Sequence, residues 1–354
     1  MLEKHLRILQ INTEKTWRGG ERQTLLTMKG LLGAGIKVRI LCLENHPLAA
    51  MAAQESIPAV LVRNQKQALM YLVKHGSAFD LIHAQTGKAQ SLAVIARPFH
   101  RLKIIYTRRV DFRPRGAAAK LKYRLTDRLV AISPAIRDIL MSFIPGKNPE
   151  VIPSCIDTSR DVLPISPKAQ EIKEKYPGRK IIGTIAAMVP HKDPLTMVMA
   201  VHELKKSAPE KFIFIHFGRG ELENRIRKEV EILGLEDEYL FMGFNQDVER
   251  FYPAFDVFVM SSQEEGLGSS VLEAFRYKVP VVSTRAGGLE KLVSGRGLLC
   301  PVNDHVCLAR NISRLLSSPE QFRQMVQKAH DYVLDRHSLE RMTRDYVRVY
   351  ERML

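Results

Sequence analysis

The segment Glu265-Gly266-Leu267-Gly268-Ser269-Ser270-Val271-Leu272-Glu273 decides the fold expected for this chain of 354 residues. It follows an apolar run, 256–260, that predicts a buried strand, and it continues into an apolar helical run, 271–275. A strand, a glycine turn and a helix N-terminus form an anion site, because the first N–H groups of a helix lack acceptors within it. Two carboxylates beside that site suit hydroxyl groups, so a nucleotide sugar fits the segment. An acidic strand-to-helix loop is the alternative.

Strand-like runs alternate with helical segments on both sides of this segment. The alternation predicts an α/β protein with parallel, doubly wound sheets that bind ligands at the carboxyl ends of their strands. Two prolines in 162–167 interrupt the pattern and predict a hinge between Rossmann-like domains at 1–165 and 166–336, which face each other across a cleft. Residues 339–354 predict an amphipathic helix. The expected strands are 7–12, 37–43, 80–83, 103–107, 128–132, 180–185, 212–217, 256–260 and 279–283.

Composition excludes several classes of protein. The apolar share of 45% is that of a globular protein, and no apolar run approaches the roughly 18 residues that span a bilayer. The first residues form no signal peptide, so a cytoplasmic location is expected. The four cysteines lack zinc-ligand spacing and predict reduced thiols. The eleven histidines are scattered, and no metal site is expected.

The net charge of +16 is concentrated in the first half of the chain. Residues 1–165 hold 26 lysines and arginines against 12 acids, a balance of +14, whereas 166–354 hold 28 against 26, a balance of +2. This asymmetry predicts an anionic partner for the first half: lipid, acidic glycan or nucleic acid. Ten cations lie within 28 residues: Arg101, Lys103, Arg108, Arg109, Arg113, Arg115, Lys120, Lys122, Arg124 and Arg128.

Apolar residues lie among these cations. The combination suits an anionic membrane, such as the inner face of the plasma membrane, and a solvated basic face is the alternative. Charge reversal of Arg113, Arg115, Lys120 and Lys122 is then expected to abolish binding to anionic liposomes. No nucleic-acid-binding motif accompanies the basic run, so no nucleic-acid partner is expected.

Three further features add to the candidate site. Gly19-Gly20 follows the first strand and precedes a helix, where glycines let backbone approach an anion; a plain tight turn is the alternative. Lys192 follows the strand 180–185, where a lysine can neutralise a diphosphate, although isolated lysines are more often solvated. Gly287-Gly288 forms another glycine loop at a strand end.

Together these elements resemble retaining glycosyltransferases of family 4, which have the GT-B fold. The resemblance runs along nearly the whole chain and implies that residues 337–354 pack back on the first domain. The matching elements are Gly19-Gly20-Glu21, Asp127-Arg128-Leu129-Val130-Ala131-Ile132-Ser133, Pro153-Ser154-Cys155-Ile156-Asp157, the pair Glu265 and Glu273, and 280–288.

The resemblance implies roles for the candidate residues. Glu273 binds the ribose hydroxyls of the donor nucleotide, Glu265 binds hydroxyls of the transferred sugar, and Lys192 neutralises the diphosphate. Glu265, Lys192, Arg109 and His83 are the expected catalytic residues, and neither a metal nor another cofactor is required. Diphosphate contacts are expected from Gly19, Gly20, Gly266, Leu267, Gly268 and Ser269, and contacts around the nucleobase from Met242, Gly243 and Phe244.

Two departures from the family pattern concern charge. Ala186-Ala187 stands where the family has a Gly-Arg pair, so one phosphate cation is missing, and Arg219 or Arg285 is expected to compensate. Arg109 replaces a frequent histidine, which places Arg109 in the cleft. His83 is expected to face the same cleft, with a structural role as the alternative.

The sequence therefore predicts transfer of a sugar, with retention of configuration, from a nucleotide diphosphate sugar, most simply a UDP-sugar. The acceptor is expected to be a glycan or a lipid-linked glycan in lipopolysaccharide or cell-surface polysaccharide assembly, and the enzyme to lie peripherally on the inner membrane face. A nucleotide-sugar epimerase of GT-B architecture and a basic nucleic-acid-binding protein are the alternatives.

Overall fold

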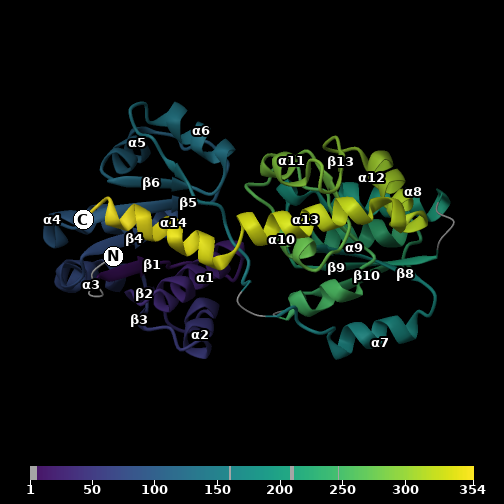
Figure 1. Cartoon of the computed structure of the whole chain (residues 1–354), viewed down its shortest axis with the longest axis horizontal. Coiled ribbons are helices and arrows are strands. Elements are labelled where there is room, and N and C mark those ends of the chain that lie inside the picture. Colours follow the sequence, from purple (N-terminus) through teal and green to yellow (C-terminus); the bar gives the residue numbers. More distant parts are fainter. Residues whose placement is uncertain (1–5, 159–160, 208–210, 246) are drawn as a thin grey trace. The chain divides into compact units, whose positions relative to one another are not determined.

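A computed structural model describes residues 6–158, 161–207, 211–245 and 247–354 (Figure 1). The chain divides into two compact units. Unit 1 comprises Met1–Thr158 and His337–Leu354, and unit 2 comprises Ser159–Arg336. Residues 161–165 thus belong to unit 2, together with the whole of the range 166–336, and the last segment of the chain returns to unit 1.

The described part of unit 1 is built on a seven-stranded parallel sheet of order β3-β2-β1-β4-β5-β6-β7. The chain winds outward from β1 in one direction and from β4 in the other, so the switch point of this sheet lies between β1 and β4. The strands are β1 (Arg7–Ile11), β2 (Lys37–Leu43), β3 (Ala59–Val62), β4 (Leu81–Ala84), β5 (Lys103–Arg108), β6 (Arg128–Ala131) and β7 (Glu150–Val151). The helices are α1 (Gly19–Gly33), α2 (Pro47–Gln54), α3 (Gln65–His75), the 3-10 helix η1 (Gly76–Ala78), α4 (Gly87–His100), α5 (Ala117–Arg124), α6 (Pro134–Phe143) and α14 (Leu339–Glu351).

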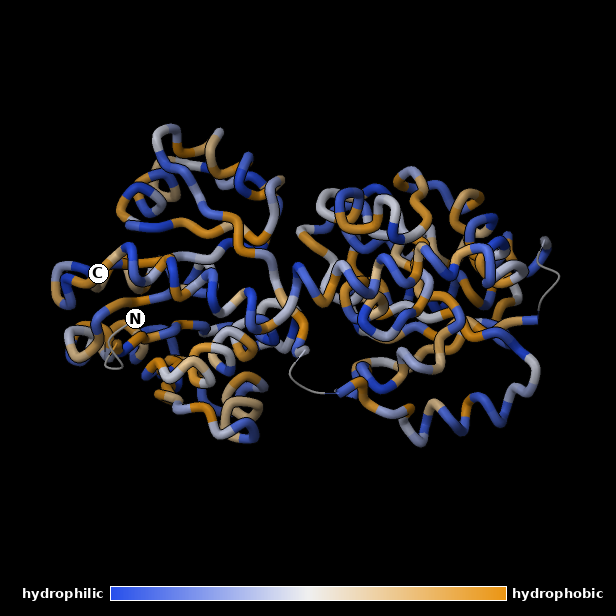
Figure 2. Tube along the Cα trace, viewed as in Figure 1, coloured by the Kyte–Doolittle hydropathy of each residue, from blue (hydrophilic) through white to orange (hydrophobic). Residues whose placement is uncertain are grey.

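Helix α14 completes the core of unit 1. Its apolar side chains recur at helical spacing and are buried with residues of α1 and β2. Figure 2 shows apolar and polar residues alternating along the chain. Tyr346 and Tyr350 lie on this buried face and are 1% and 0% exposed. The helix expected at 339–354 therefore forms at 339–351 and packs against the part of unit 1 that precedes residue 159.

Unit 2 repeats the architecture with a six-stranded parallel sheet of order β10-β9-β8-β11-β12-β13 among its described residues. Its switch point lies between β8 and β11. The strands are β8 (Lys180–Ile185), β9 (Phe212–Phe217), β10 (Tyr239–Gly243), β11 (Val257–Met260), β12 (Val281–Thr284) and β13 (Leu298–Cys300). The helices are α7 (Pro167–Lys175), η2 (Pro190–Lys192), α8 (Pro194–Ser207), α9 (Glu223–Ile232), η3 (Val248–Ala254), α10 (Ser269–Arg276), α11 (Gly288–Val293), α12 (His305–Ser317), η4 (Pro319–Phe322) and α13 (Arg323–Arg336).

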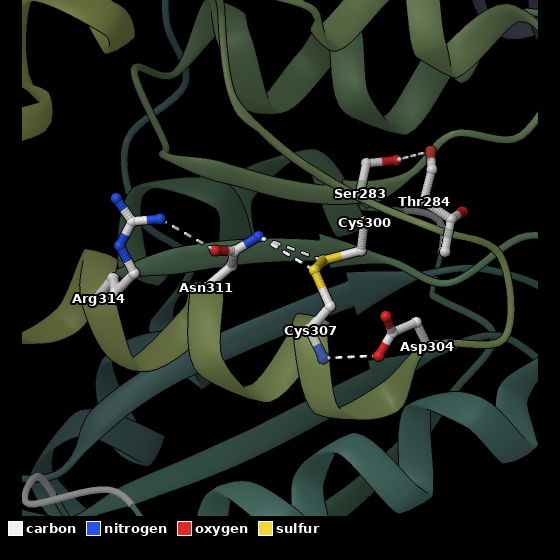
Figure 3. Close-up of a disulfide and its surroundings, with 7 residues drawn as sticks. All are labelled: Ser283, Thr284, Cys300, Asp304, Cys307, Asn311 and Arg314. Carbon is white, nitrogen blue, oxygen red and sulfur yellow. Dashed lines mark hydrogen bonds between the residues drawn. A yellow bond between two sulfur atoms is a disulfide. The ribbon is translucent and has the colours of Figure 1, made fainter.

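The cysteines depart from expectation. Cys300, at the end of β13, forms a disulfide with Cys307 in the first turn of α12 (Figure 3). Asn311 donates from Nδ2 to the Sγ of Cys300 at 3.2 Å, and the Cα atoms of the two cysteines are 5.7 Å apart, a normal disulfide spacing. The prediction of reduced thiols is wrong for this pair, because a strand end and a helix start bring the two positions together. Cys42 and Cys155 are free and buried.

None of the helices in the described ranges combines the length and the apolar character that crossing a bilayer requires.

Candidate functional site

The candidate site in unit 2 lies at the switch point of the sheet. Lys192 ends η2 shortly after β8, and Glu265 lies in the loop after the neighbouring strand β11. The Nζ of Lys192 forms an ion pair with Oε2 of Glu265, and the two side chains are 19% and 15% exposed. Two residues that are 73 positions apart in sequence thus meet where an open parallel sheet binds ligands.

Hydrogen bonds hold the two loops in register. The backbone N–H of Gln263 donates to the carbonyl oxygen of His191 at 2.9 Å, and the Ser261 hydroxyl donates to the carbonyl oxygen of Lys192 at 3.1 Å. Asp193 takes a left-handed φ of 46° and caps α8 by accepting from the N–H of Thr196 at 3.2 Å. The backbone around Lys192 is therefore fixed independently of its ion pair.

Glycines bring a second loop against the first. Gly268 precedes α10 with a φ of 86°, a left-handed conformation that favours glycine. The N–H of Gly288, at the start of α11, donates to the carbonyl oxygen of Glu265 at 2.7 Å, and the backbone of Gly266 leaves no room for a Cβ at Gly288. The glycine loops after β11 and β12 are thus one packed unit, with the first-turn N–H groups of α10 directed at its end. Leu267 and Ser269 complete the loop around Gly268.

Glu273 differs from Glu265 in its surroundings. It lies within α10 and its side chain is 3% exposed. Arg276, one turn later, brings Nη1 to 3.9 Å from Oε2 of Glu273 and to 2.7 Å from Oε1 of Glu249. This arginine thus places positive charge beside both carboxylates. The role of Glu273 toward ribose hydroxyls stays a prediction.

The loop after β10 contains the residues expected beside the nucleobase. Gly243 has a φ of 62°, Phe244 is 52% exposed, and Met242 is half-buried on the edge strand. The side chain of Arg219 lies over Gly243, and the carbonyl oxygen of Arg219 accepts from the N–H of Met188 at 3.2 Å. Arg219 therefore borders both this loop and the loop that lacks the family arginine.

The second candidate for that missing cation is engaged elsewhere. Arg285 forms an ion pair with Glu290, at 3.2 Å between Nη1 and Oε1, and its side chain is 52% exposed. Of the two arginines, Arg219 has the guanidinium without an ion-pair partner among the residues that the structure describes.

The candidate residues of unit 1 lie at its own switch point. Gly19 and Gly20 open α1, which follows β1, and the N–H of Arg18 donates to Oε2 of Glu21 at 2.9 Å. The N-terminus of α1 is therefore built like that of α10, from glycines without a side-chain cap on the first amides.

His83 is enclosed in a hydrogen-bond network. Its Nδ1 is 2.8 Å from the hydroxyl of Tyr350, and its Nε2 is 2.8 Å from the hydroxyl of Thr107. Burial, together with the charge of Arg109, holds the pKa of His83 well below its usual range, so the ring is neutral at pH 7. These contacts with α14 favour the structural alternative for His83. The sequence predicts only an amphipathic helix at 339–354, although a tyrosine such as Tyr350 on its buried face signals a hydroxyl that needs a partner.

Arg109 follows β5 and is half-buried. Its Nη1 donates to the carbonyl oxygen of Gln85 at 3.2 Å, and its Nε has no partner among the described residues. The structure thus places Arg109 at the carboxyl end of the unit 1 sheet, and its expected catalytic role stays a prediction.

Two Rossmann-like units, each with a glycine-bearing helix N-terminus at the switch point of a parallel sheet, define an α/β protein of the GT-B fold. Family comparisons agree. Residues 17–160 match the model described as Glycosyltransferase Family 4, and residues 166–332 match Glycosyl transferases group 1. The chain belongs to the group 1 glycosyltransferases.

Individual relatives are distant but extensive. The lipopolysaccharide core biosynthesis glycosyltransferase LpsE of Rhizobium meliloti is 26% identical over 64% of this chain and 65% of LpsE, slightly less than two thirds of its length. An Escherichia coli UDP-Gal:alpha-D-GlcNAc-diphosphoundecaprenol alpha-1,3-galactosyltransferase is 22% identical over 84% of this chain and 85% of the relative. The crystal structure of Anabaena HepE with UDP and glucose has a TM-score of 0.85 at 18% identity, over 98% of this chain and 100% of that chain, which supports the fold.

Proposed function

We propose that this protein transfers a sugar from a nucleotide diphosphate sugar to a glycan or lipid-linked glycan, with retention of configuration, during lipopolysaccharide or polysaccharide assembly. The observation that carries the proposal is the Lys192–Glu265 pair beside the N-terminus of α10. It combines a cation, an acceptor of hydroxyl hydrogen bonds and free helix amides at one switch point. The activities of LpsE and of the galactosyltransferase support the assignment, and UDP in HepE supports a UDP-sugar.

The ion pair suggests how the donor enters. A diphosphate carries more negative charge than a carboxylate, so it competes with Glu265 for the Nζ of Lys192. Once Lys192 contacts the diphosphate, Glu265 is released to accept hydrogen bonds from the sugar hydroxyls. The amides of Leu267, Gly268 and Ser269 add donors to the leaving diphosphate.

The proposed chemistry needs no protein nucleophile and no metal. The departing phosphate accepts the proton of the acceptor hydroxyl while the sugar is transferred on the same face. The protein contributes fixed positive charge that stabilises the leaving diphosphate in the transition state. Lys192 and the first-turn amides of α10 supply this charge in unit 2.

A thermal-shift screen against UDP-, GDP- and ADP-sugars tests the proposal. Binding to the folded state raises the melting temperature in proportion to affinity, so one nucleotide class should stabilise the protein selectively. The variants Lys192→Met and Glu265→Gln should lose this stabilisation, whereas Lys173→Met, at an exposed lysine of α7, should retain it. No stabilisation by any nucleotide sugar would contradict the proposal. Product analysis with donor alone separates transfer from epimerisation, because an epimerase converts the donor without an acceptor.

A peripheral membrane position is proposed for unit 1. Phe112, Leu121 and Leu125 are 63%, 58% and 41% exposed on and beside α5, and Arg113 and Arg124 are exposed among them. Apolar side chains between cations suit the interface of an anionic bilayer. Lys122, which the sequence grouped with the surface cations, is half-buried instead.

Vesicle sedimentation tests this position. The variant R113E/R115E/R124E should lose binding to vesicles that contain phosphatidylglycerol, while neutral phosphatidylcholine vesicles should bind neither protein. The matched control K173E/R225E/K228E changes the same charge at exposed positions of unit 2 and should bind as the unaltered protein does. Equal loss in both variants would show that net charge alone governs binding.

A further inference from the structure

The basic run of unit 1 contains an inner group of cations that differs from its exposed members. Arg108, at the end of β5, is 3% exposed. Its Nη1 donates to the hydroxyl of Tyr123 at 2.5 Å and its Nη2 donates to the carbonyl oxygen of Phe112, while Nε has no partner among the described residues. A buried guanidinium is thus held by neutral oxygens and aromatic rings rather than by a carboxylate.

Lys122 is the second member of the group. Its Nζ donates to the carbonyl oxygen of Gly87 at 3.0 Å and to the hydroxyl of Ser91 at 3.2 Å, both in the first turns of α4. Lys122 and Arg108 both lie 5.9 Å from the ring centre of Tyr123. Burial, and then the charge of Arg108, lower the pKa of Lys122, so the two cations repel each other in this structure.

Arg109 is the third member. It contacts Gln85, two residues before the Gly87 that Lys122 contacts. The segment from Gln85 to the start of α4 is therefore bordered by Arg109 and Lys122. Thr86 caps α4 by accepting from the N–H of Ala89 at 3.2 Å, which leaves the amides of Gly87 and Lys88 as the first-turn donors. All of this lies at the carboxyl ends of β4 and β5.

No carboxylate balances the three cations within the described part of unit 1. The nearby acids that bind a partner bind other cations: Asp127 pairs with Arg97 at 2.9 Å, and Glu14 pairs with Lys88 at 2.9 Å. Asp111, in the same loop, forms no ion pair among the described residues. Desolvated cations without counter-charge destabilise a folded unit, which points to an external anion as the missing partner.

We propose that Arg108, Arg109 and Lys122, with the N-terminus of α4, bind a phosphoryl group of the acceptor, either a phosphate ester or a diphosphate. The guanidinium fork of Arg109 and the helix amides match phosphate oxygens, and three positive charges match a group with two or more negative charges better than a single carboxylate. The inference rests on the proposed function for the identity of the second substrate, but the anion site itself stands on these contacts alone.

Calorimetric titration with inorganic pyrophosphate tests the site. Saturating UDP is present to occupy the donor site, and ionic strength is matched with chloride. We expect the unaltered protein to bind pyrophosphate under these conditions, and Arg109→Gln and Lys122→Gln each to weaken binding at least tenfold. Lys66→Gln, at an exposed lysine of α3, is the control and should change nothing. Arg108 is left intact because its burial makes a folding defect the expected result.

The titration of UDP separates this inference from the proposed function. Arg109→Gln and Lys122→Gln should bind UDP as the unaltered protein does, which also shows that they fold. If UDP does not bind at all, the proposed function fails, and pyrophosphate is titrated into Lys192→Met, which keeps the unit 1 cations. Absence of pyrophosphate binding beyond that of chloride, or variants that bind pyrophosphate as tightly as the unaltered protein does, overturns the anion site.

Competition then identifies the source of the phosphoryl group. Glucose 1-phosphate represents a phosphorylated glycan, and farnesyl diphosphate represents a lipid-linked diphosphate. Displacement of pyrophosphate by one of them, with loss of that displacement in Arg109→Gln, assigns the acceptor class. Displacement by neither compound overturns the acceptor part of the proposal.

Discussion

The two units share one architecture and differ in how they balance charge. Unit 1 holds 29 lysines and arginines against 14 acids, a balance of +15, and unit 2 holds 25 against 24, a balance of +1. Both are parallel sheets with a glycine-bearing helix at the switch point. The same fold therefore accommodates a strongly basic unit and a nearly neutral one. The sheet determines where a ligand binds, and the loop residues determine which ligand it is.

The difference is sharpest among the cations near each switch point. In unit 2, Lys192 pairs with Glu265 and Arg276 pairs with Glu249, whereas Arg219 has no ion-pair partner among the described residues. In unit 1, Arg108, Arg109 and Lys122 contact neutral oxygens. Under the two proposals, a donor diphosphate would replace Glu265 as the partner of Lys192 in unit 2, whereas an anion would bind unit 1 without displacing a carboxylate.

Replacing the cation of each unit should separate their roles most strongly. Lys192→Met removes the proposed charge on the leaving diphosphate, and we expect kcat to fall about 10²–10³-fold. Arg109→Gln should instead raise the KM for a phosphorylated acceptor while leaving UDP affinity unchanged. Steady-state kinetics with both substrates varied measures the two effects. A loss of UDP affinity in Arg109→Gln would contradict the assignment of donor binding to unit 2 and of acceptor binding to unit 1.

Only unit 2 contains a disulfide among the described residues, so reduction should act on that unit alone. We expect Cys307→Ser to lower the free energy of unfolding by about 2–3 kcal/mol, because the bond closes a short loop between β13 and α12. Denaturant unfolding with and without reductant measures the effect, and the variant should be insensitive to reductant. Titration of four free thiols in the untreated protein would instead restore the sequence-based prediction.

A buried neutral histidine is common to both units and predicts a shared acid sensitivity. Burial lowers the pKa of His216 on β9 to about 4, and that of His83 on β4 is also lowered. The unfolded chain, with a histidine pKa near 6.5, binds the proton first, so stability is present above about pH 6.5 and is lost as pH falls. For His216 we expect a loss of about 2 kcal/mol between pH 7 and pH 5.

Denaturant unfolding across this pH range measures the loss. His216→Gln should flatten the pH dependence, whereas His75→Gln, at an exposed position of α3, should leave it unchanged. An unaltered slope in His216→Gln would show that other groups dominate the acid response.

The smallest expected effect concerns the contact of α14 with unit 1. Tyr350→Phe removes a buried hydroxyl that accepts from Nε2 of Gln10 at 3.3 Å and contacts His83. We expect a loss of about 1–2 kcal/mol in the free energy of unfolding, because the buried side chains of Gln10 and His83 lose a hydrogen-bond partner. Tyr71→Phe is the control, since the Tyr71 hydroxyl forms no hydrogen bond within the described residues. Equal stability of both variants would remove the structural role assigned to His83.

The central strands could be predicted from the sequence, and the edge strands could not. Each strand that apolar runs predicted lies inside a sheet, as β1, β4, β8 and β11 do. The four strands that were missed, β3, β7, β10 and β13, are the four sheet edges. An edge strand is partly exposed, as β3 is, and needs no continuous apolar run, so its pairing is decided by the neighbouring strand.

The loops of the proposed donor site could also be predicted from the sequence, because they directly follow strands that apolar runs indicate. Glycines and charged residues directly after apolar runs indicate the carboxyl ends of strands, so Gly268 and Lys192 could be assigned to one edge of a sheet. The ion pair of Lys192 with Glu265, and the packing of Gly288 against Gly266, depend on strand order and appear only in the folded unit. Strand order is a long-range property that local periodicity does not contain.

By itself, the sequence determined the fold class, the glycine loops and the excess of positive charge in the first half. Each of these depends only on the local order of residues or on composition. Tertiary structure decided which charges meet. It divided one basic run into exposed cations around Arg113 and an inner group around Arg108, and it enclosed His83 beneath α14. Burial and pairing depend on residues far apart along the chain, and these two quantities decide whether a charge is solvated, balanced or available to a ligand.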